Sequence, residues 1–101
     1  MTYRLGEHAE RDVRTIYVNG VRDFGLDHAD RYFDELFEKF AFLAAHPEAA
    51  RLRTEFNPPV RAYPFKAHLI VYGLDEAGDV FILAVHHGRE NWHADPRGER
   101  D

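Results

Sequence analysis

The sequence contains no cysteine, which excludes disulfide bonds and thiol catalysis and permits a reducing compartment. It has no run of about 18 apolar residues, so no segment is expected to span a membrane. Residues Met1–Glu7 lack the basic region and the apolar stretch of a secretory signal. We therefore expect a cytoplasmic protein without membrane contacts.

Positive charge is also scarce. Lys39 and Lys66 are the only lysines, and the formal net charge of the 101 residues is −5. Because affinity for a nucleic-acid backbone comes from clustered cations, such a chain is a poor non-specific nucleic-acid binder. Residues 51–89 nevertheless hold five basic against four acidic side chains. A small cationic focus in this half could still bind one phosphate or one acidic peptide.

The length fits one domain with one core, which we place at residues 1–96, followed by a polar tail at 97–101. Two amphipathic helices are predicted in the first half. Gly20 lies on the apolar stripe of the first helix, where it would let the second helix approach closely, and Gly25 would end the first helix. Pro47 ends the second. The apolar positions at helical spacing are Ala9, Val13, Ile16, Tyr17 and Phe24, then Ala29, Tyr32, Phe33, Leu36, Phe37, Phe40, Leu43 and Ala44.

The link between the helices is only two or three residues, so they should form an antiparallel hairpin. Residues 47–50 suggest one further helical turn, and the polar stretch from Asn91 onward is expected to fray. Four strands are predicted, at residues 3–5, 60–63, 69–74 and 80–85, with a hairpin loop at 75–79. The predicted fold is α+β, in the order β-α-α-β-β-β, with the helical hairpin on one face of a curved, mainly antiparallel sheet.

Three features of the second half resemble a known family. Arg61 enters the second strand, His68-Leu69-Ile70-Val71-Tyr72 forms the third, and His87-Gly88-Arg89-Glu90-Asn91-Trp92 follows the fourth. These motifs resemble the ParE branch of the RelE/ParE toxins of bacterial type II toxin–antitoxin modules, and the resemblance extends over residues 2–95. It implies the same RelE/ParE toxin fold.

The resemblance also implies a function and partners. A ParE toxin of a ParDE module binds DNA gyrase, traps it with broken DNA and blocks replication, without a bond-making step or a cofactor of its own. Its partner is a ParD-like ribbon-helix-helix antitoxin, whose C-terminal segment folds on the toxin. The N-terminal part of that antitoxin binds operator DNA, so the toxin meets this DNA only indirectly.

Two alternatives remain open. A RelE-like toxin would cut messenger RNA on the ribosome, and Arg61, His87 and Arg89 would then be the catalytic candidates. However, the basic cluster is thin, and Trp92 stands where nuclease relatives often carry a catalytic tyrosine, while an indole cannot act as a general base. His86 and His87 should point to opposite faces of a strand, which favours structural hydrogen bonds over acid–base catalysis. The other alternative is a non-toxic relative that only binds antitoxin.

The candidate residues for binding the target or the antitoxin are Arg53, Arg61, Arg89 and Trp92. Arg61 and Arg89 each either recognise an acidic or phosphate group or tie down a loop through a carboxylate such as Glu55 or Glu90. Trp92 either covers the edge of the core or anchors an interface. Phe42 falls off the apolar stripe and is a candidate exposed contact. The seven histidines are too scattered, or too poorly supported by carboxylates, to predict a metal site.

Overall fold

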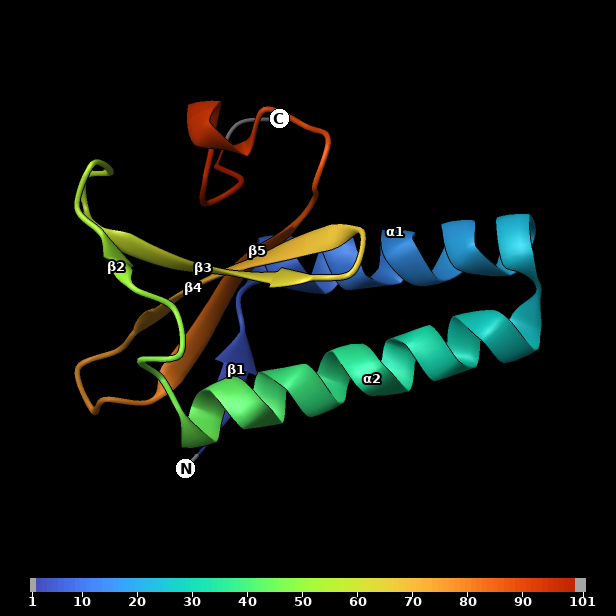
Figure 1. Cartoon of the computed structure of the whole chain (residues 1–101), viewed down its shortest axis with the longest axis horizontal. Coiled ribbons are helices and arrows are strands. Elements are labelled where there is room, and N and C mark those ends of the chain that lie inside the picture. The colour runs from blue at the N-terminus through green and yellow to red at the C-terminus, as the bar shows by residue number, and fades with distance from the viewer. Residues whose placement is uncertain (1, 100–101) are drawn as a thin grey trace.

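The computed structural model describes residues 2–99, in which a helical hairpin covers one face of a five-stranded sheet (Figure 1). The strand order is β1-β5-β4-β3-β2. The edge strand β1 runs parallel to β5, and the other three pairings are antiparallel. The elements are β1 Tyr3–Leu5, α1 Glu7–Phe24, α2 Leu26–Ala45, β2 Leu52–Arg53, β3 Val60–Phe65, β4 His68–Leu74, β5 Val80–His87 and a short 3-10 helix, η1, Trp92–Ala94. The predicted α+β fold and its mainly antiparallel sheet are thus confirmed.

The hairpin turns on a single glycine. Gly25 has a φ of +90°, a value that favours glycine, and its N–H bonds the carbonyl of Val21 while its carbonyl accepts the N–H of Ala29. The link is therefore shorter than the two or three residues expected. A Cβ added at Gly20 would lie 3.4 Å from the Cβ of Ala29, which confirms the predicted close approach of the helices.

The main core lies between the hairpin and the sheet. Leu36, Phe40 and Leu43 of α2 are fully buried against side chains of β4 and β5, such as Ile70 and Ile82. Each large apolar side chain removed from water in this way contributes about 1.5–3 kcal/mol. The helical periodicity of α2 therefore accounts for how the hairpin is held on the sheet.

The opposite face of the sheet has its own apolar cluster. Val60, Val71 and Ala84 are covered there by Trp92, from the segment that crosses this face after β5 (Figure 1). Strands β4 and β5 are thus central and buried on both faces, which explains why they appear as continuous apolar runs in the sequence.

A β-bulge in β5 determines which face of the sheet the side chains of this strand point to. Val71 pairs with Ala84, but the next residue, Tyr72, pairs with Ile82, so Leu83 has no partner. The extra residue shifts the alternation by one position. As a result Ile82 and Val85 both join the core under the helices.

The sheet is larger than expected. The two-residue strand β2 was not predicted, because two residues carry no readable alternation. β3 continues past the expected stop at Pro64, because β2 pairs only with Val60 and Arg61 and leaves the rest of that side of β3 as an edge. A proline, which cannot donate to a ladder, is tolerated there. β4 begins one residue early, at His68, and β5 continues to His87.

Two local predictions were wrong. Residues 47–50 form turns rather than a helical turn. The segment from Asn91 to Glu99 does not fray: Trp92 is buried, and Gly98 packs so closely on the ring of His8 that a Cβ would not fit. Residues 100 and 101 of the expected tail lie outside the described residues.

Candidate functional site

A half-open cleft of about 490 Å³ lies between the two helices and the end of the sheet where β4 begins and β5 ends. Its walls are mainly apolar, and polar side chains gather at the sheet end and along the rim. The apolar wall consists of Ile16, Phe24, Ala29, Tyr32, Phe33 and Leu36. The acidic and histidine side chains of the lining are Asp12, Asp23, His28, His68, His87 and Glu90.

The cleft is open because several of its lining residues are small. Gly20 on α1, Ala29 on α2 and Ala67 in the β3–β4 turn all line it. Since no large side chain projects from these positions, the space between the helices and the sheet end is not filled. Phe24, at the far end of α1, leaves 69% of its surface exposed.

Two histidines face each other at the sheet end of the cleft. His68 and His87 are partners across the β4–β5 pairing, with ring centroids 5.4 Å apart. Burial, assisted by the neighbouring His87, lowers the pKa of His68, while burial raises the pKa of Tyr32. The protonated Tyr32 hydroxyl therefore donates to Nδ1 of a neutral His68, over 2.6 Å. Nδ1 of His87 accepts the N–H of Arg89 at 3.1 Å.

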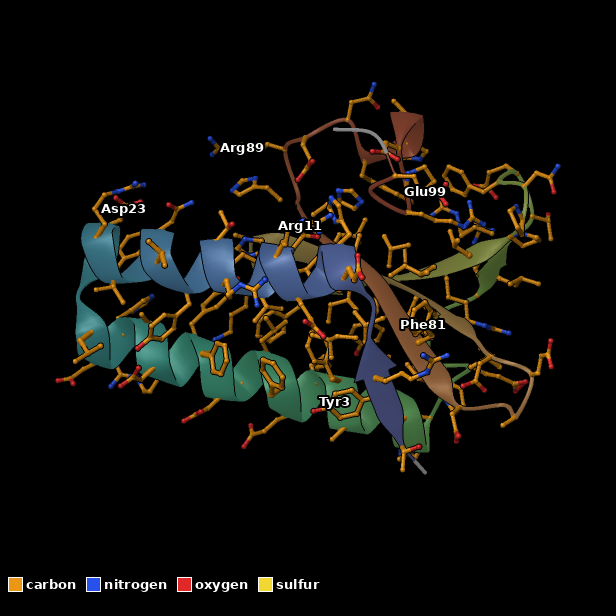
Figure 2. All side chains as sticks on the ribbon, turned by 180° about the vertical axis from the view of Figure 1, so that it is seen from behind. Tyr3, Arg11, Asp23, Phe81, Arg89 and Glu99 are labelled. Atoms are coloured by element: carbon orange, nitrogen blue, oxygen red, sulfur yellow. The ribbon has the colours of Figure 1, made fainter. Side chains whose placement is uncertain are left out.

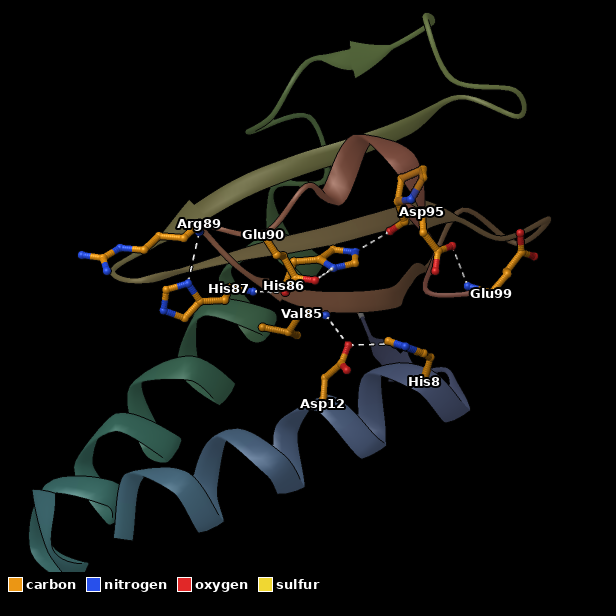
Figure 3. A network of polar contacts seen from close by, with 10 residues as sticks. His8, Asp12, Val85, His86, His87, Arg89, Glu90, Asp95 and Glu99 are labelled. Atoms are coloured by element: carbon orange, nitrogen blue, oxygen red, sulfur yellow. Dashed lines mark hydrogen bonds and ion pairs between the residues drawn. The ribbon is translucent and has the colours of Figure 1, made fainter. Parts of the chain in front are cut away.

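A carboxylate of α1 ties the hairpin to β5. Asp12 Oδ2 accepts the N–H of Val85 at 2.9 Å and contacts Nδ1 of His8 at 2.9 Å (Figure 3). Because β1 pairs only as far as Ile82, the N–H of Val85 lies beyond the reach of that neighbouring strand. Burial raises the pKa of Asp12 in spite of these bonds.

A second carboxylate holds the loop after β5. Glu90 Oε1 accepts the N–H of His87, and Oε2 lies 3.3 Å from Nδ1 of His86. His86 is buried and its Nε2 donates to the carbonyl of Pro96 at 2.9 Å. The two histidines therefore differ as predicted: His86 makes structural hydrogen bonds under the C-terminal segment, and His87 faces the cleft.

The structure does not assemble the catalytic set considered for a nuclease. His87 lies in the cross-strand row of His68 and Phe65, whereas Arg61 is four residues back along β3. At about 3.3 Å per residue this is a separation of about 13 Å along the strand. Arg89 follows His87 closely but contacts it through its backbone N–H. Among residues 2–99, no guanidinium lines the cleft to stabilise a phosphorane.

Arg53 and Trp92, two of the predicted binding residues, lie together on the face of the sheet opposite the helices. The Arg53 guanidinium sits 5.2 Å from the Trp92 ring centroid and 5.8 Å from that of Phe56. Its Nε donates to Glu55 at 2.7 Å. Trp92 is buried over the second apolar cluster and so covers the core, the first of its two predicted roles.

The other two arginines make different contacts. Arg61 is half-buried, and its Nη1 donates to the carbonyl of Ala50 at 2.6 Å, so it holds the chain before β2 through a backbone carbonyl and not through a carboxylate. Arg89 is exposed and projects from the loop after β5 (Figure 2). Within residues 2–99 no carboxylate pairs with its guanidinium, so the alternative in which Arg89 ties down a loop through a carboxylate such as Glu90 is not found. Phe42 is partly exposed, at 37%, and its ring also packs near Tyr63.

Two further properties of the described chain bear on function. Among residues 2–99, no group of three or more histidine, aspartate or glutamate side chains is placed to hold a metal ion. None of the helices in the same range is long and apolar enough to cross a membrane.

Comparison with known protein families identifies one family. The sequence profile of the "ParE toxin of type II toxin-antitoxin system, parDE" matches residues 3–92. This chain belongs to the ParE toxin family. The fold is also similar to that of a chain from the chromosomal ParDE TA system of P. aeruginosa, with a TM-score of 0.72 and 20% identity, covering 86% of this chain and 95% of the other. A search of curated proteins found no significant match.

The cleft of this ParE-family toxin was only partly visible in its sequence. The sequence makes His87 a candidate, but His68 stands only within a strand motif, and Tyr32 falls on the apolar stripe of the second helix. The register of the β4–β5 hairpin could have paired His68 with His87, had the bulge at Leu83 been known. No sequence signal places Tyr32 beside them, because that contact joins residues 36 positions apart.

Proposed function

We propose that this ParE toxin poisons DNA gyrase in the cytoplasm by surface recognition, and that a ParD-like ribbon-helix-helix antitoxin neutralises it. The observation that carries the proposal is the apolar cleft between the helices and the sheet end, in a chain of the ParE family. An amphipathic helix laid in an apolar groove is a recurrent mode of peptide recognition. The C-terminal segment of the antitoxin would fill this cleft, and operator DNA would contact only the antitoxin.

The arginines supply the proposed polar contacts with the target or the antitoxin. Arg89 is the strongest candidate, because its exposed guanidinium has no carboxylate partner among the described residues. The Arg53 guanidinium lies over an aromatic ring, although it is also paired with Glu55. Arg61 and Trp92 are proposed to act mainly by holding the surface in shape, since one bonds a backbone carbonyl and the other is buried.

No bond-making step is assigned to the toxin. The catalytic alternative, cleavage of messenger RNA on the ribosome, would need base, acid and cations together, and Arg61 lies about 13 Å along the sheet from His87. A toxin that only binds its antitoxin is the other alternative. Both are outcomes of the tests below.

Growth separates a toxin from a non-toxic relative. Induction of the chain in a bacterium should reduce colony counts, and co-expression of the antitoxin encoded by the neighbouring reading frame should restore them. Normal growth with verified expression of folded protein would contradict the proposal. Purified toxin should inhibit gyrase supercoiling and leave messenger RNA on stalled ribosomes intact; the reverse pattern would establish the nuclease.

Arg89 and Arg61 should respond differently to truncation. Arg89→Ala should keep wild-type stability and weaken target binding by about 1.5–3 kcal/mol if the guanidinium meets a charged group. Arg61→Ala should instead lower the free energy of unfolding, because the Ala50 carbonyl loses its charged donor. Urea denaturation and a gyrase binding assay on both variants test this. If Arg89→Ala binds the target as tightly as wild type, Arg89 is not part of the interface.

A further inference from the structure

The cleft is negatively charged along its rim. Three carboxylates and three histidines line it, together with two tyrosines, and no lysine or arginine of the described chain does. Asp12 and Glu90 lie at the sheet end, and Asp23 lies near the hairpin turn. The nearby Lys66 is held on Glu35, with Nζ–Oε distances of 2.5 and 2.9 Å.

Within residues 2–99, neither Asp12 nor Glu90 has a lysine or arginine partner. Asp12 accepts from a backbone N–H and contacts His8, and Glu90 accepts from a backbone N–H and contacts His86. Of the three carboxylates, Asp23 alone has a guanidinium partner in the part of the chain that the structure describes; this partner is Arg22, and both side chains are about half exposed or more. An exposed pair of this kind is weak and leaves Asp23 able to exchange partners.

The spacing of the carboxylates defines the length of an occupant. Asp12 and Asp23 are eleven residues apart on α1, which at about 1.5 Å per residue places them about 16 Å apart along the helix. The apolar wall runs between them, from Ile16 to the exposed ring of Phe24. A helix of about three turns spans the same distance.

We propose that the cleft binds an amphipathic helical segment of a partner protein whose apolar face is flanked at each end by lysine or arginine. The apolar wall receives the apolar face, while Asp12 with Glu90 at one end and Asp23 at the other receive the cations. The inference rests on the proposed function in so far as the partner is the antitoxin. It adds that the segment bound in the cleft carries basic residues at both ends. This charge is specified for the cleft alone and not for partners that bind other surfaces of the toxin.

A pair of designed peptides tests the charge of the occupant. The first is a 14-residue amphipathic helix with leucines at i, i+3, i+4 and i+7 spacing and lysines at both ends, and the second replaces these lysines with glutamates. Fluorescence anisotropy should show at least about tenfold tighter binding of the lysine peptide at low salt, and its affinity should fall as salt shortens the Debye length from about 10 Å at 0.1 M to about 3 Å at 1 M. Equal or tighter binding of the glutamate peptide would overturn the proposal.

Toxin variants locate the binding. Asp23→Asn and Glu90→Gln should each lower the affinity for the lysine peptide by about two- to fivefold, as expected for exposed ion pairs. Glu38→Gln is the matched control, because Glu38 is exposed on α2, does not line the cleft and changes the net charge equally. Asn19→Trp, an exposed rim position, should block the cleft and abolish binding without unfolding the protein. An equal effect of Glu38→Gln, or no effect of Asn19→Trp, would show that the peptide binds elsewhere.

The same variants separate this inference from the proposed function. If the neighbouring antitoxin rescues growth equally with wild type and with the Asp23→Asn, Glu90→Gln double variant but fails with Asn19→Trp, the antitoxin occupies the cleft and the charge inference is wrong. If no antitoxin rescues growth while the lysine peptide binds as expected, the charge inference stands and the antitoxin proposal fails.

Discussion

Asp12 shows how a single side chain joins two layers of the fold. It bonds the N–H of Val85 at a point that the short strand β1 does not reach (Figure 3). An unsatisfied buried donor costs about 1–3 kcal/mol. Asp12→Ala should lower the free energy of unfolding by about that amount, whereas Asp12→Asn keeps an acceptor oxygen, loses the cost of burying a charge and should stay near wild type. Urea denaturation of both variants decides this, and equal losses would contradict it.

The pH dependence of stability should report on His68. Because burial lowers its pKa, the unfolded chain binds the proton more readily, so the stability contributed by His68 is full above the ordinary imidazole pKa and is lost as the pH falls towards the lowered value. Asp12, whose pKa is raised, acts in the opposite direction at lower pH. Between about pH 7.5 and about pH 5.5 the urea midpoint of the wild type should therefore fall more than that of His68→Gln. Parallel curves would exclude His68 as the cause.

At the scale of elements, the hairpin depends on small residues at its crossing. Gly20 faces Ala29, and a Cβ there just reaches van der Waals contact at 3.4 Å. Gly20→Ala should be close to neutral, because the gain of up to about 1 kcal/mol in helix propensity offsets a tight contact. Gly20→Leu should separate the helices, lower stability by about 1–3 kcal/mol and narrow the cleft. Thermal unfolding and peptide binding on both variants test this; a Gly20→Leu protein as stable as wild type would show that the helices can move apart freely.

At the scale of the whole molecule, both faces of the sheet are covered, but by different kinds of structure. The hairpin covers one face with two long helices, whereas the other depends on a loop and the segment around Trp92 (Figure 1). Trp92→Ala should cost about 3–5 kcal/mol and free the segment after β5. Hydrogen exchange should then accelerate in residues 88–99 more than in α2. Uniform acceleration would mean that the two covers unfold together.

The amino-acid sequence by itself determined the elements whose pattern is local. Helical periodicity, Gly20, Gly25 and Pro47 are enough to predict the hairpin, and the apolar runs are enough to predict two central strands, because each signal repeats within a few residues. The motifs from Arg61 to Trp92 were enough to indicate the family. The tertiary structure alone decided the rest: the bulge at Leu83, the pairing of β2, the partner of Arg61, and the cleft that gathers Asp12, Tyr32, His68 and His87. These contacts join residues far apart in the chain, and their geometry depends on register and packing, which no short stretch of sequence carries.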